Sequence, residues 1–301
     1  MRTIPLAFLL TLAAGTASAQ DARWAPIRRA FGQAGETEAG YFRINLPRSD
    51  LQVRIGNDAL SPAFEFTSYL GFAPVGARDV LAMGEVILRD DEVAAALAEA
   101  HRQGVRVTAV HNHLIGETPR IVYVHVLAQG SAAAIATKLR AVFASSATPL
   151  GAQSESPAAT GDWAVIDAVL GPHAEAEGSV AEYVFPRRER LQVHGIAVRS
   201  TGLLETASEV VFEQLGGGRV ASTGELFVLA SEVDPVVRAL DEHGLQVTAV
   251  HHHMVEASPT MYWVHWYAVG DGPALARGVA AALLRMTSAR KSQAETKAPS
   301  T

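Results

Sequence analysis

A seven-residue stretch that occurs twice decides how this chain is interpreted. Residues 107–113 read Val-Thr-Ala-Val-His-Asn-His, and residues 247–253, 140 positions later, read Val-Thr-Ala-Val-His-His-His. A short run rich in β-branched residues, with histidines two positions apart, is typical of a strand on which both imidazoles share one face. Its return at a long, fixed offset indicates a duplicated unit.

The duplication extends over most of the chain. Further blocks recur in the same order at offsets of 139 or 140 residues: Gly84-Glu85 and Gly224-Glu225, Gly104 and Gly244, Pro119 and Pro259, His125 and His265, Pro47-Arg48 and Pro186-Arg187, Trp24 and Trp163. We expect two repeat domains, over residues 20–143 and 163–286. The segment 144–162 is rich in Ser, Ala, Gly and Pro, which predicts a linker, and the polar residues 287–301 predict a disordered tail.

Both copies contain the same predicted elements. A short helix comes first, strand-like runs flank the Pro-Arg turn, a strand follows Gly-Glu, and a helix ends at Gly104 or Gly244. Asp234-Pro235 is interpreted as the start of that helix in the second copy. A hairpin over 105–114 and 120–128, or 245–254 and 260–268, precedes a final amphipathic helix. Because strands pair locally and helices gather on one side, we predict an α+β fold.

This fold class is a tandem duplication of a domain with a mainly antiparallel sheet and helices packed on one face. The equal size of the copies also predicts that they pair about a pseudo-twofold axis.

The composition excludes several classes of protein. The 301 residues are 49% hydrophobic and 19% charged, which excludes a disordered chain. The formal net charge of −6 argues against a nucleic-acid partner, because such a protein needs a concentrated basic surface. Cysteine is absent, which excludes disulfides, thiolate metal sites and cysteine nucleophiles.

The first 19 residues have the pattern of a secretory signal peptide. Arg2 is followed by an apolar run over residues 6–14, and Ala17-Ser18-Ala19 forms an A-x-A cleavage site. The apolar run is too short to cross a bilayer as a helix of the mature protein. We therefore expect a periplasmic or secreted protein with no transmembrane segment in the mature chain.

Three histidines in each copy are predicted to share one face of the hairpin. They are His111, His113 and His125 in the first copy and His251, His253 and His265 in the second. Pairing of positions that sum to 236 or 238 places His125 opposite one of the other two rings. The other parity carries Val110 and Val124, which we expect to face the core. The histidine face is then a second, partly open face of the sheet.

A cluster of three neutral imidazoles is suited to metal binding. Imidazole binds zinc, copper, nickel and iron, and three such ligands leave a fourth position for water or substrate. We expect a divalent metal, with zinc as the first candidate and copper as the second. Water on a zinc ion has a pKa near 7, which would allow hydrolysis. Glu85 and Glu225 would supply a further ligand or the catalytic base if the Gly-Glu strand lies beside the hairpin.

Two alternatives remain open from the residues alone. The histidines can be structural, in a non-catalytic module that binds a small molecule or an envelope partner. Arg48 and Arg187, each after a proline between two strands, form either an anion clamp or turn residues paired with a carboxylate, and we favour the second.

The block order resembles the LppY/LpqO family: Pro-Arg at a strand end, Gly-Glu, a helix, H-[NH]-H, a proline and a final histidine. The resemblance covers nearly the whole chain after residue 19, in both copies, and Asn112 fits the family's usual HNH, whereas His252 departs from it. It implies an exported, duplicated protein without an assigned activity, in which the six histidines belong to the family motif. Some members are similar to lipoproteins, but this chain has no lipid-bearing cysteine.

Overall fold

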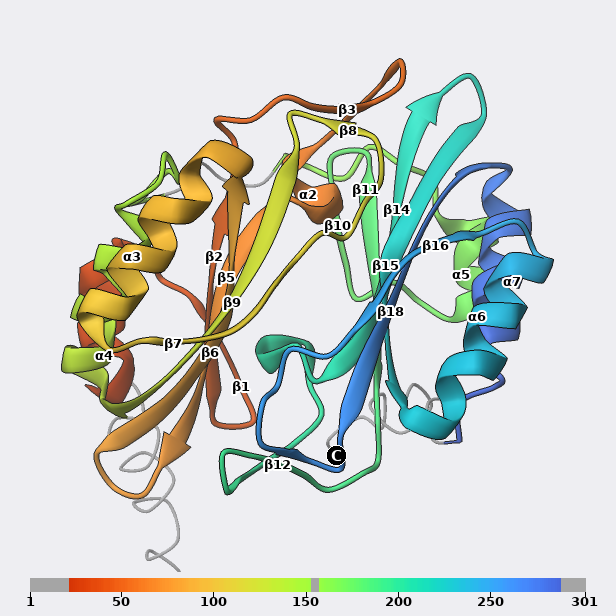
Figure 1. The fold of residues 1–301 in the computed structure, drawn as a ribbon. Helices are drawn as coiled ribbons and strands as arrows, with labels where there is room; N and C mark the ends of the chain where they lie inside the picture. The colour runs from red at the N-terminus through yellow and green to blue at the C-terminus, as the bar shows by residue number, and fades with distance from the viewer. Residues whose placement is uncertain (1–21, 153–156, 288–301) are drawn as a thin grey trace, which may run out of the picture.

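The computed structural model describes residues 22–152 and 157–287 (Figure 1). The predicted signal peptide lies outside these residues, as does the tail after Thr287. In the described part of the chain no helix is both long and apolar enough to cross a membrane.

Each half is built on one six-stranded antiparallel sheet, which confirms the predicted α+β fold. The sheet of the first half has the strand order β1 (Glu36–Glu38), β2 (Tyr41–Pro47), β5 (Thr67–Val75), β6 (Asp79–Arg89), β9 (Ile121–Ser131) and β7 (Arg106–His111). Its outer face is covered by α3 (Val93–Gln103), α4 (Ala132–Phe143) and a helix over residues 22–31 (Figure 1).

The second half repeats this arrangement. Its strand order is β10 (Glu175–Glu177), β11 (Val180–Pro186), β14 (Ala207–Gly216), β15 (Arg219–Leu229), β18 (Met261–Gly270) and β16 (Gln246–His251). The helices are α5 (Ala164–Leu170), α6 (Val233–Glu242) and α7 (Gly272–Leu283). The strands β5 and β14, which lie before the Gly-Glu strands, were not expected from the sequence.

The two sheets face each other, and the helices lie on the outside (Figure 1). Alternate residues of β2, Phe42, Ile44 and Leu46, point to the helices of the first half and join its core. The opposite, inner faces form cores that are shared by both halves. In one of them Met83 and Leu127 pack with Phe227 and Trp263. The inner faces are therefore buried by the partner repeat instead of being open to solvent.

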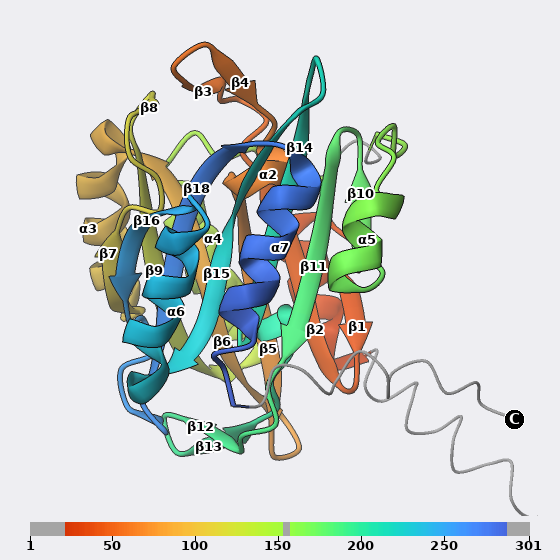
Figure 2. The ribbon, with the colours of Figure 1, turned by 90° about the vertical axis from the view of Figure 1, so that its right-hand side faces the viewer.

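Two small sheets close the interface at opposite ends (Figure 2). In the first half β3 (Val53–Ile55) pairs with β4 (Asp58–Leu60) and with β8 (Glu117–Thr118). In the second half β12 (Leu191–Val193) pairs with β13 (Ile196–Val198) and with β17 (Ala257–Ser258). Two short helical turns, α2 (Pro62–Glu65) and η2 (Gly202–Leu204), reach across to strands of the other half.

Two local expectations were wrong. Val110 is 48% exposed instead of buried in the core, because β7 is the edge strand of its sheet. Asp234-Pro235 does not begin α6. A 3₁₀ turn over Ala230–Glu232 precedes the helix, and the carboxylate of Glu232 accepts a hydrogen bond from the backbone N–H of Leu229 at 2.8 Å. The helix therefore starts one residue before Asp234.

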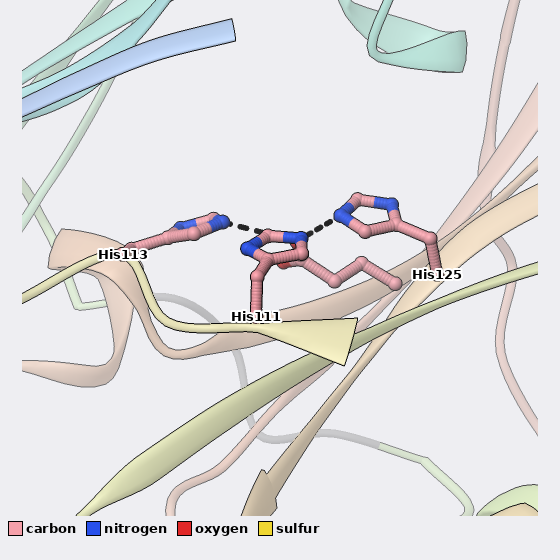
Figure 3. Close-up of side chains that lie close together, drawn as sticks. His111, His113 and His125 are labelled. Carbon is pink, nitrogen blue, oxygen red and sulfur yellow. Dashed lines mark ion pairs between the residues drawn. The ribbon is translucent and has the colours of Figure 1, made fainter. Parts of the chain in front are cut away.

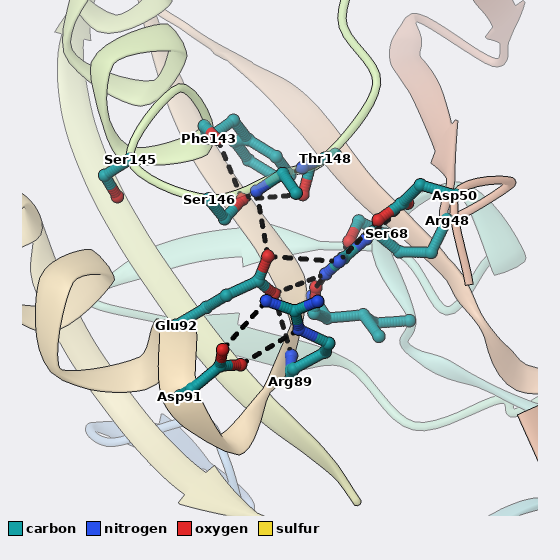
Figure 4. A network of polar contacts seen from close by, with 12 residues as sticks. Arg48, Asp50, Ser68, Arg89, Asp91, Glu92, Phe143, Ser145, Ser146 and Thr148 are labelled. Atoms are coloured by element: carbon teal, nitrogen blue, oxygen red, sulfur yellow. Dashed lines mark hydrogen bonds and ion pairs between the residues drawn. The ribbon is translucent and has the colours of Figure 1, made fainter. Parts of the chain in front are cut away.

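Arg48 is a buried structural residue, which confirms the favoured interpretation. Its guanidinium lies between Asp50 (2.8 Å) and Glu92 (2.9 Å), below the turn that follows α4 (Figure 4). Arg187 repeats the arrangement with Glu189 and with Glu232 (2.8 Å). Each guanidinium donates to two carboxylates and to a backbone carbonyl of its own half, so it is unsuited to clamp an external anion.

The described parts of the segment between the repeats make specific contacts. Ala147 donates its backbone N–H to Glu92 at 2.9 Å, and the carbonyl oxygen of Pro157 accepts from Gly178 at 3.0 Å. Residues near both ends of the predicted linker are thus fastened to the repeat that each one adjoins.

Candidate metal centre

The three histidines of the first repeat share the inner face of the sheet, as predicted. Their register is different, however. His111 pairs with Tyr123, and His125 pairs with Ala109, so that paired positions sum to 234. The reason is that residues 112–120 do not continue the ladder between β7 and β9. Instead, β8 within this segment pairs with β3. Because the sum is still even, the rings stay on one face and become diagonal neighbours.

Glu85 lies beside these rings, because β6 pairs with β9 and sets Glu85 opposite His125. The Oε2 atom of Glu85 is 3.0 Å from Nε2 of His125 and 3.5 Å from Nε2 of His113. Figure 3 shows the rings of His111, His113 and His125 lying close together. In the second half Glu225 is opposite His265, with 3.9 Å between Oε2 and Nε2.

The expectation of two separate, partly open histidine faces was wrong. The two inner faces cover each other, and the six rings form one cluster. The ring centroids of His111 and His251 are 3.8 Å apart. Two further pairs join His113 or His253 of one repeat to the final histidine of the other and are equally close: His125 and His253 at 3.6 Å, and His113 and His265 at 3.9 Å. The cluster therefore belongs to both repeats.

Many polar atoms of the cluster are buried without a hydrogen bond. In the described part of the chain these include both ring nitrogens of His111 and His251, Nε2 of His253 and Oε1 of Glu225. Oε2 of Glu85 contacts Nε2 of His113 and of His125, but these atoms form no hydrogen bond. A buried polar atom without a partner costs about 1–3 kcal/mol. So many unpartnered polar atoms in one place indicate that the cluster is a binding site for a ligand.

Two further carboxylates, Glu65 and Glu205, reach the cluster and were missed by the sequence analysis. Oε2 of Glu65 is 3.0 Å from Nδ1 of His113. Oε2 of Glu205 is 3.7 Å from Nδ1 of His253 and 3.8 Å from Nδ1 of His125. The signal was present, because Glu65 and Glu205 are related by the offset of 140 that relates the histidines.

Both carboxylates are presented by segments that cross the interface. Glu65 ends α2, and its Oε1 accepts a hydrogen bond from Thr223 of the other half at 3.1 Å. Glu205 follows η2 and accepts a hydrogen bond from the hydroxyl of Tyr69. Its backbone has a φ of +52°, which is uncommon for a residue with a Cβ and more frequent at functional sites.

The electrostatics of the cluster favour neutral side chains in the absence of a cation. Burial raises the pKa of Glu65 and of Glu85 to about 8, and the charge of Glu85 adds to the effect on Glu65. Burial also lowers the pKa of His125 to about 3. Neutral imidazole is the form that binds metals, and a divalent ion would stabilise the charged carboxylates.

Three sets of ligand atoms lie close enough to bind an ion, each within 4.8 Å of one another. The first set comes from one repeat and comprises Glu85, His111, His113 and His125. The other two sets draw on both repeats and comprise His113, His251 and His265, and His125, Glu205 and His253. All donors are nitrogen or oxygen, which suits zinc, copper and related divalent metals.

An acidic cavity of about 820 Å³ leads to the cluster from the surface. Glu36 and Glu175, which are exposed, lie among its lining residues, as do the buried Glu85, Glu205 and Glu225. Arg43 is the one basic lining residue in the described part of the chain. The cavity therefore offers cations a route to the histidines that is lined by carboxyl groups.

Comparison with known protein families identifies the family of the chain. The family model described as Domain of Unknown Function (DUF1259) matches residues 25–145 and again residues 164–285. The chain belongs to the DUF1259 family. Each DUF1259 match covers one sheet with its helices, so the duplicated unit seen in the structure is the unit of the family.

Other comparisons add little to this DUF1259 protein. No curated protein matches it. A solved structure, the trimeric bacterial microcompartment shell protein PduB, is 10% identical and covers 84% of this chain and 89% of its own, with a TM-score of 0.21. A likeness at that score carries no inference about fold or function.

Proposed function

We propose that this protein binds a divalent metal ion at the histidine cluster between its repeats, with zinc first and copper second. The observation that carries the proposal is the set of buried ring nitrogens and carboxylate oxygens without hydrogen bonds, gathered within ligand distance of one another. A purely structural network would use these atoms in hydrogen bonds, as the network of Arg48 does.

The surroundings of the cluster support the same proposal. A metal site needs deprotonated ligands, outer partners that orient them and a route of entry. Glu65 contacts the Nδ1 atom of His113, which leaves Nε2 available as a ligand. The acidic cavity supplies the route.

Metal analysis of the purified protein tests this proposal. We expect the protein without its signal peptide to contain a stoichiometric divalent metal, and the double variant His111→Ala/His251→Ala to contain less. His252→Ala is the matched control, because His252 lies next to His251 in sequence but is exposed and belongs to none of the ligand sets. Absence of a stoichiometric metal, with the same content in the double variant, would overturn the proposal.

A zinc-dependent hydrolase is a sharper form of this proposal, favoured by the access that the cavity gives to the cluster. A zinc ion would lower the pKa of a bound water toward 7. Glu85, which lies 3.0 Å from His125, suits either a ligand or an outer partner that orients this ring, whereas Glu225 lies outside the three sets, with Oε1 unpartnered, and suits the base.

A panel of esters, phosphoesters and amides, offered to the zinc-loaded protein, tests for hydrolysis. We expect Glu225→Gln to lose activity while it keeps its metal. Full activity in both Glu85→Gln and Glu225→Gln on any substrate found would contradict the hydrolase.

We also propose export to the periplasm or secretion, supported by the signal-peptide pattern of residues 1–19. The resemblance to the LppY/LpqO family supports the same location. Expression of the full chain in a Gram-negative host, followed by fractionation and N-terminal sequencing, should give a periplasmic product that begins at Gln20. An uncleaved product in the cytoplasm would contradict this proposal.

The alternative to metal binding is a non-catalytic module that binds a small molecule or an envelope partner through the same face of the sheets.

A further inference from the structure

We propose that the cluster holds two divalent ions at once, each bound by ligands from both repeats. One ion is bound by His125, His253 and Glu205, and the other by His113, His251 and His265. The proposal rests on the metal-binding function and adds the number of ions and the origin of their ligands. It makes the metal centre a joint between the repeats.

The first set has the dimensions of a tetrahedral site. The two Nδ1 atoms of His125 and His253 are 2.5 Å apart, and Oε2 of Glu205 is 3.8 Å and 3.7 Å from them. Ligands at about 2.0–2.1 Å from a tetrahedral zinc ion lie about 3.3 Å from one another. The three separations lie on both sides of this value, so small side-chain movements bring all three atoms onto one ion.

The second set consists of buried ring nitrogens. Both nitrogens of His251 are buried without a hydrogen bond, whereas Nε2 of His113 lies 3.5 Å from Oε2 of Glu85 and Nε2 of His265 lies 3.9 Å from Oε2 of Glu225. The remaining nitrogen of His113 contacts Glu65, in the carboxylate–histidine arrangement that orients metal ligands. The rings of His113 and His265 are stacked with their centroids 3.9 Å apart. The two sets share no residue and can be filled together.

Occupation of the four-residue set alone would leave the three histidine rings of the second repeat without a metal ion. That set uses Glu85, His111, His113 and His125, all from the first repeat. The unpartnered nitrogens of the three second-repeat rings would stay buried, at about 1–3 kcal/mol each. Two ions in the mixed sets bind five of the six rings. The mixed arrangement therefore gives ligand roles to rings of both repeats, which the four-residue set does not.

The charges around the cluster favour cations. Four carboxylates contact its rings: the half-buried Glu65 and the buried Glu85, Glu205 and Glu225. In the described part of the chain the ion-pair contacts of these four are with histidines and none is with Lys or Arg. Divalent ions would supply positive charge that stabilises the ionised form of these carboxylates, in addition to that of Arg43, which acts on Glu85 and Glu205.

Single substitutions distinguish the two-ion centre from a single ion in the four-residue set. We expect two equivalents of metal in the parent protein, one in His253→Ala, one in His251→Ala, none in the double variant and two in His111→Ala. A single ion in the four-residue set predicts one equivalent in the parent, loss of it in His111→Ala and no change in His253→Ala. That second result would overturn the two-ion proposal and leave the metal-binding function intact. A parent protein without metal would overturn both.

A second measurement uses the unsubstituted protein and so does not depend on whether the variants fold. The apo-protein is loaded with Cu²⁺, and its electron paramagnetic resonance spectrum is recorded at one and at two equivalents. We expect dipolar broadening and a half-field signal when the second equivalent is bound, because both ions lie in one cluster of contacting rings. An isolated Cu²⁺ spectrum, with the second equivalent free in solution, would contradict two ions per chain.

Discussion

The Nδ1 atoms of His125 and His253 lie 2.5 Å apart, although the two residues are 128 positions apart in the sequence and belong to different repeats. Two ring nitrogens at this distance need a shared proton or a shared cation between their lone pairs. His253 also packs against Trp263, at 3.6 Å between ring centroids, and His113 stacks on Tyr123 at the same distance. These aromatic contacts hold the rings of His253 and His113 in place.

Removal of the metal should destabilise the whole protein. Because the ligands come from both halves, a bound ion stabilises the native state by RT ln(1 + [L]/Kd), or about 2.7 kcal/mol at one hundred times Kd. We expect an excess of chelator to lower the melting temperature by about 5–10 °C, and added Zn²⁺ to restore it. A thermal scan with and without chelator measures this. An identical melting temperature in both would favour the non-catalytic binding module.

Gly71→Ala should weaken both the interface and the metal centre. A Cβ at position 71 would lie 2.2 Å from the carbonyl oxygen of Leu203 in the other half, so that η2 and the adjoining Glu205 must move. Overpacking of this kind costs about 1–3 kcal/mol. We expect a lower midpoint of urea unfolding and a loss of metal.

Gly270→Ala is the control for that substitution. Its Cβ would meet only the side chain of Leu275, at 3.8 Å, so that stability and metal content should remain at the parent level. Equal metal content in Gly71→Ala and the parent would show that Glu205 is not a ligand.

Arg48→Ala should be among the more damaging substitutions far from the metal. It leaves the buried carboxylate of Glu92 without its cation, which costs about 3–5 kcal/mol. Arg89→Ala removes a solvent-exposed pair with Asp91, which is worth less than about 1 kcal/mol. Urea unfolding of the two variants measures the difference. Equal losses would contradict the structural role of the buried arginine.

Acid should destabilise the second half through Glu232. Burial alone would raise its pKa, but hydrogen bonds from Arg187 and Thr287 lower it from 4.5 to about 2. Because the unfolded chain binds the proton more tightly, the stabilisation is complete above pH 4.5 and is lost as the pH falls toward 2. Glu232→Gln should remove up to about 1.4 kcal/mol per pH unit from the slope of the unfolding free energy.

Urea unfolding between pH 5 and pH 3 measures this slope, with the exposed Glu38→Gln as the control. Parallel curves for Glu232→Gln and the parent protein would contradict the proposed linkage.

The sequence predicted the duplicated α+β fold because its periodic signals are local. Alternation of side chains placed His111 and His125 on one face, and that parity survived an error in the register. The offset that relates the repeats placed Glu85 and Glu225 in equivalent strands beside the histidines.

The contact between the repeats could not be predicted in the same way. Which faces pack together depends on the inner cores, where residues such as Met83 and Trp263 meet across the interface. Each histidine face alone resembles a solvent-facing surface, because its neighbours come from the other copy. Glu65 and Glu205 were missed for a related reason, since they lie on short turns without a hydrophobic period.

The two segments that carry Glu65 and Glu205, α2 and η2 with the residue after it, couple the evolution of the two copies. Each segment contacts the other copy, so a substitution on one side of the interface selects for a compensating substitution on the other. The outer helices contact their own sheets and are free of this restraint. The four glutamates and six histidines of the cluster should therefore be the residues that diverge least between the copies, and they occupy equivalent positions in both.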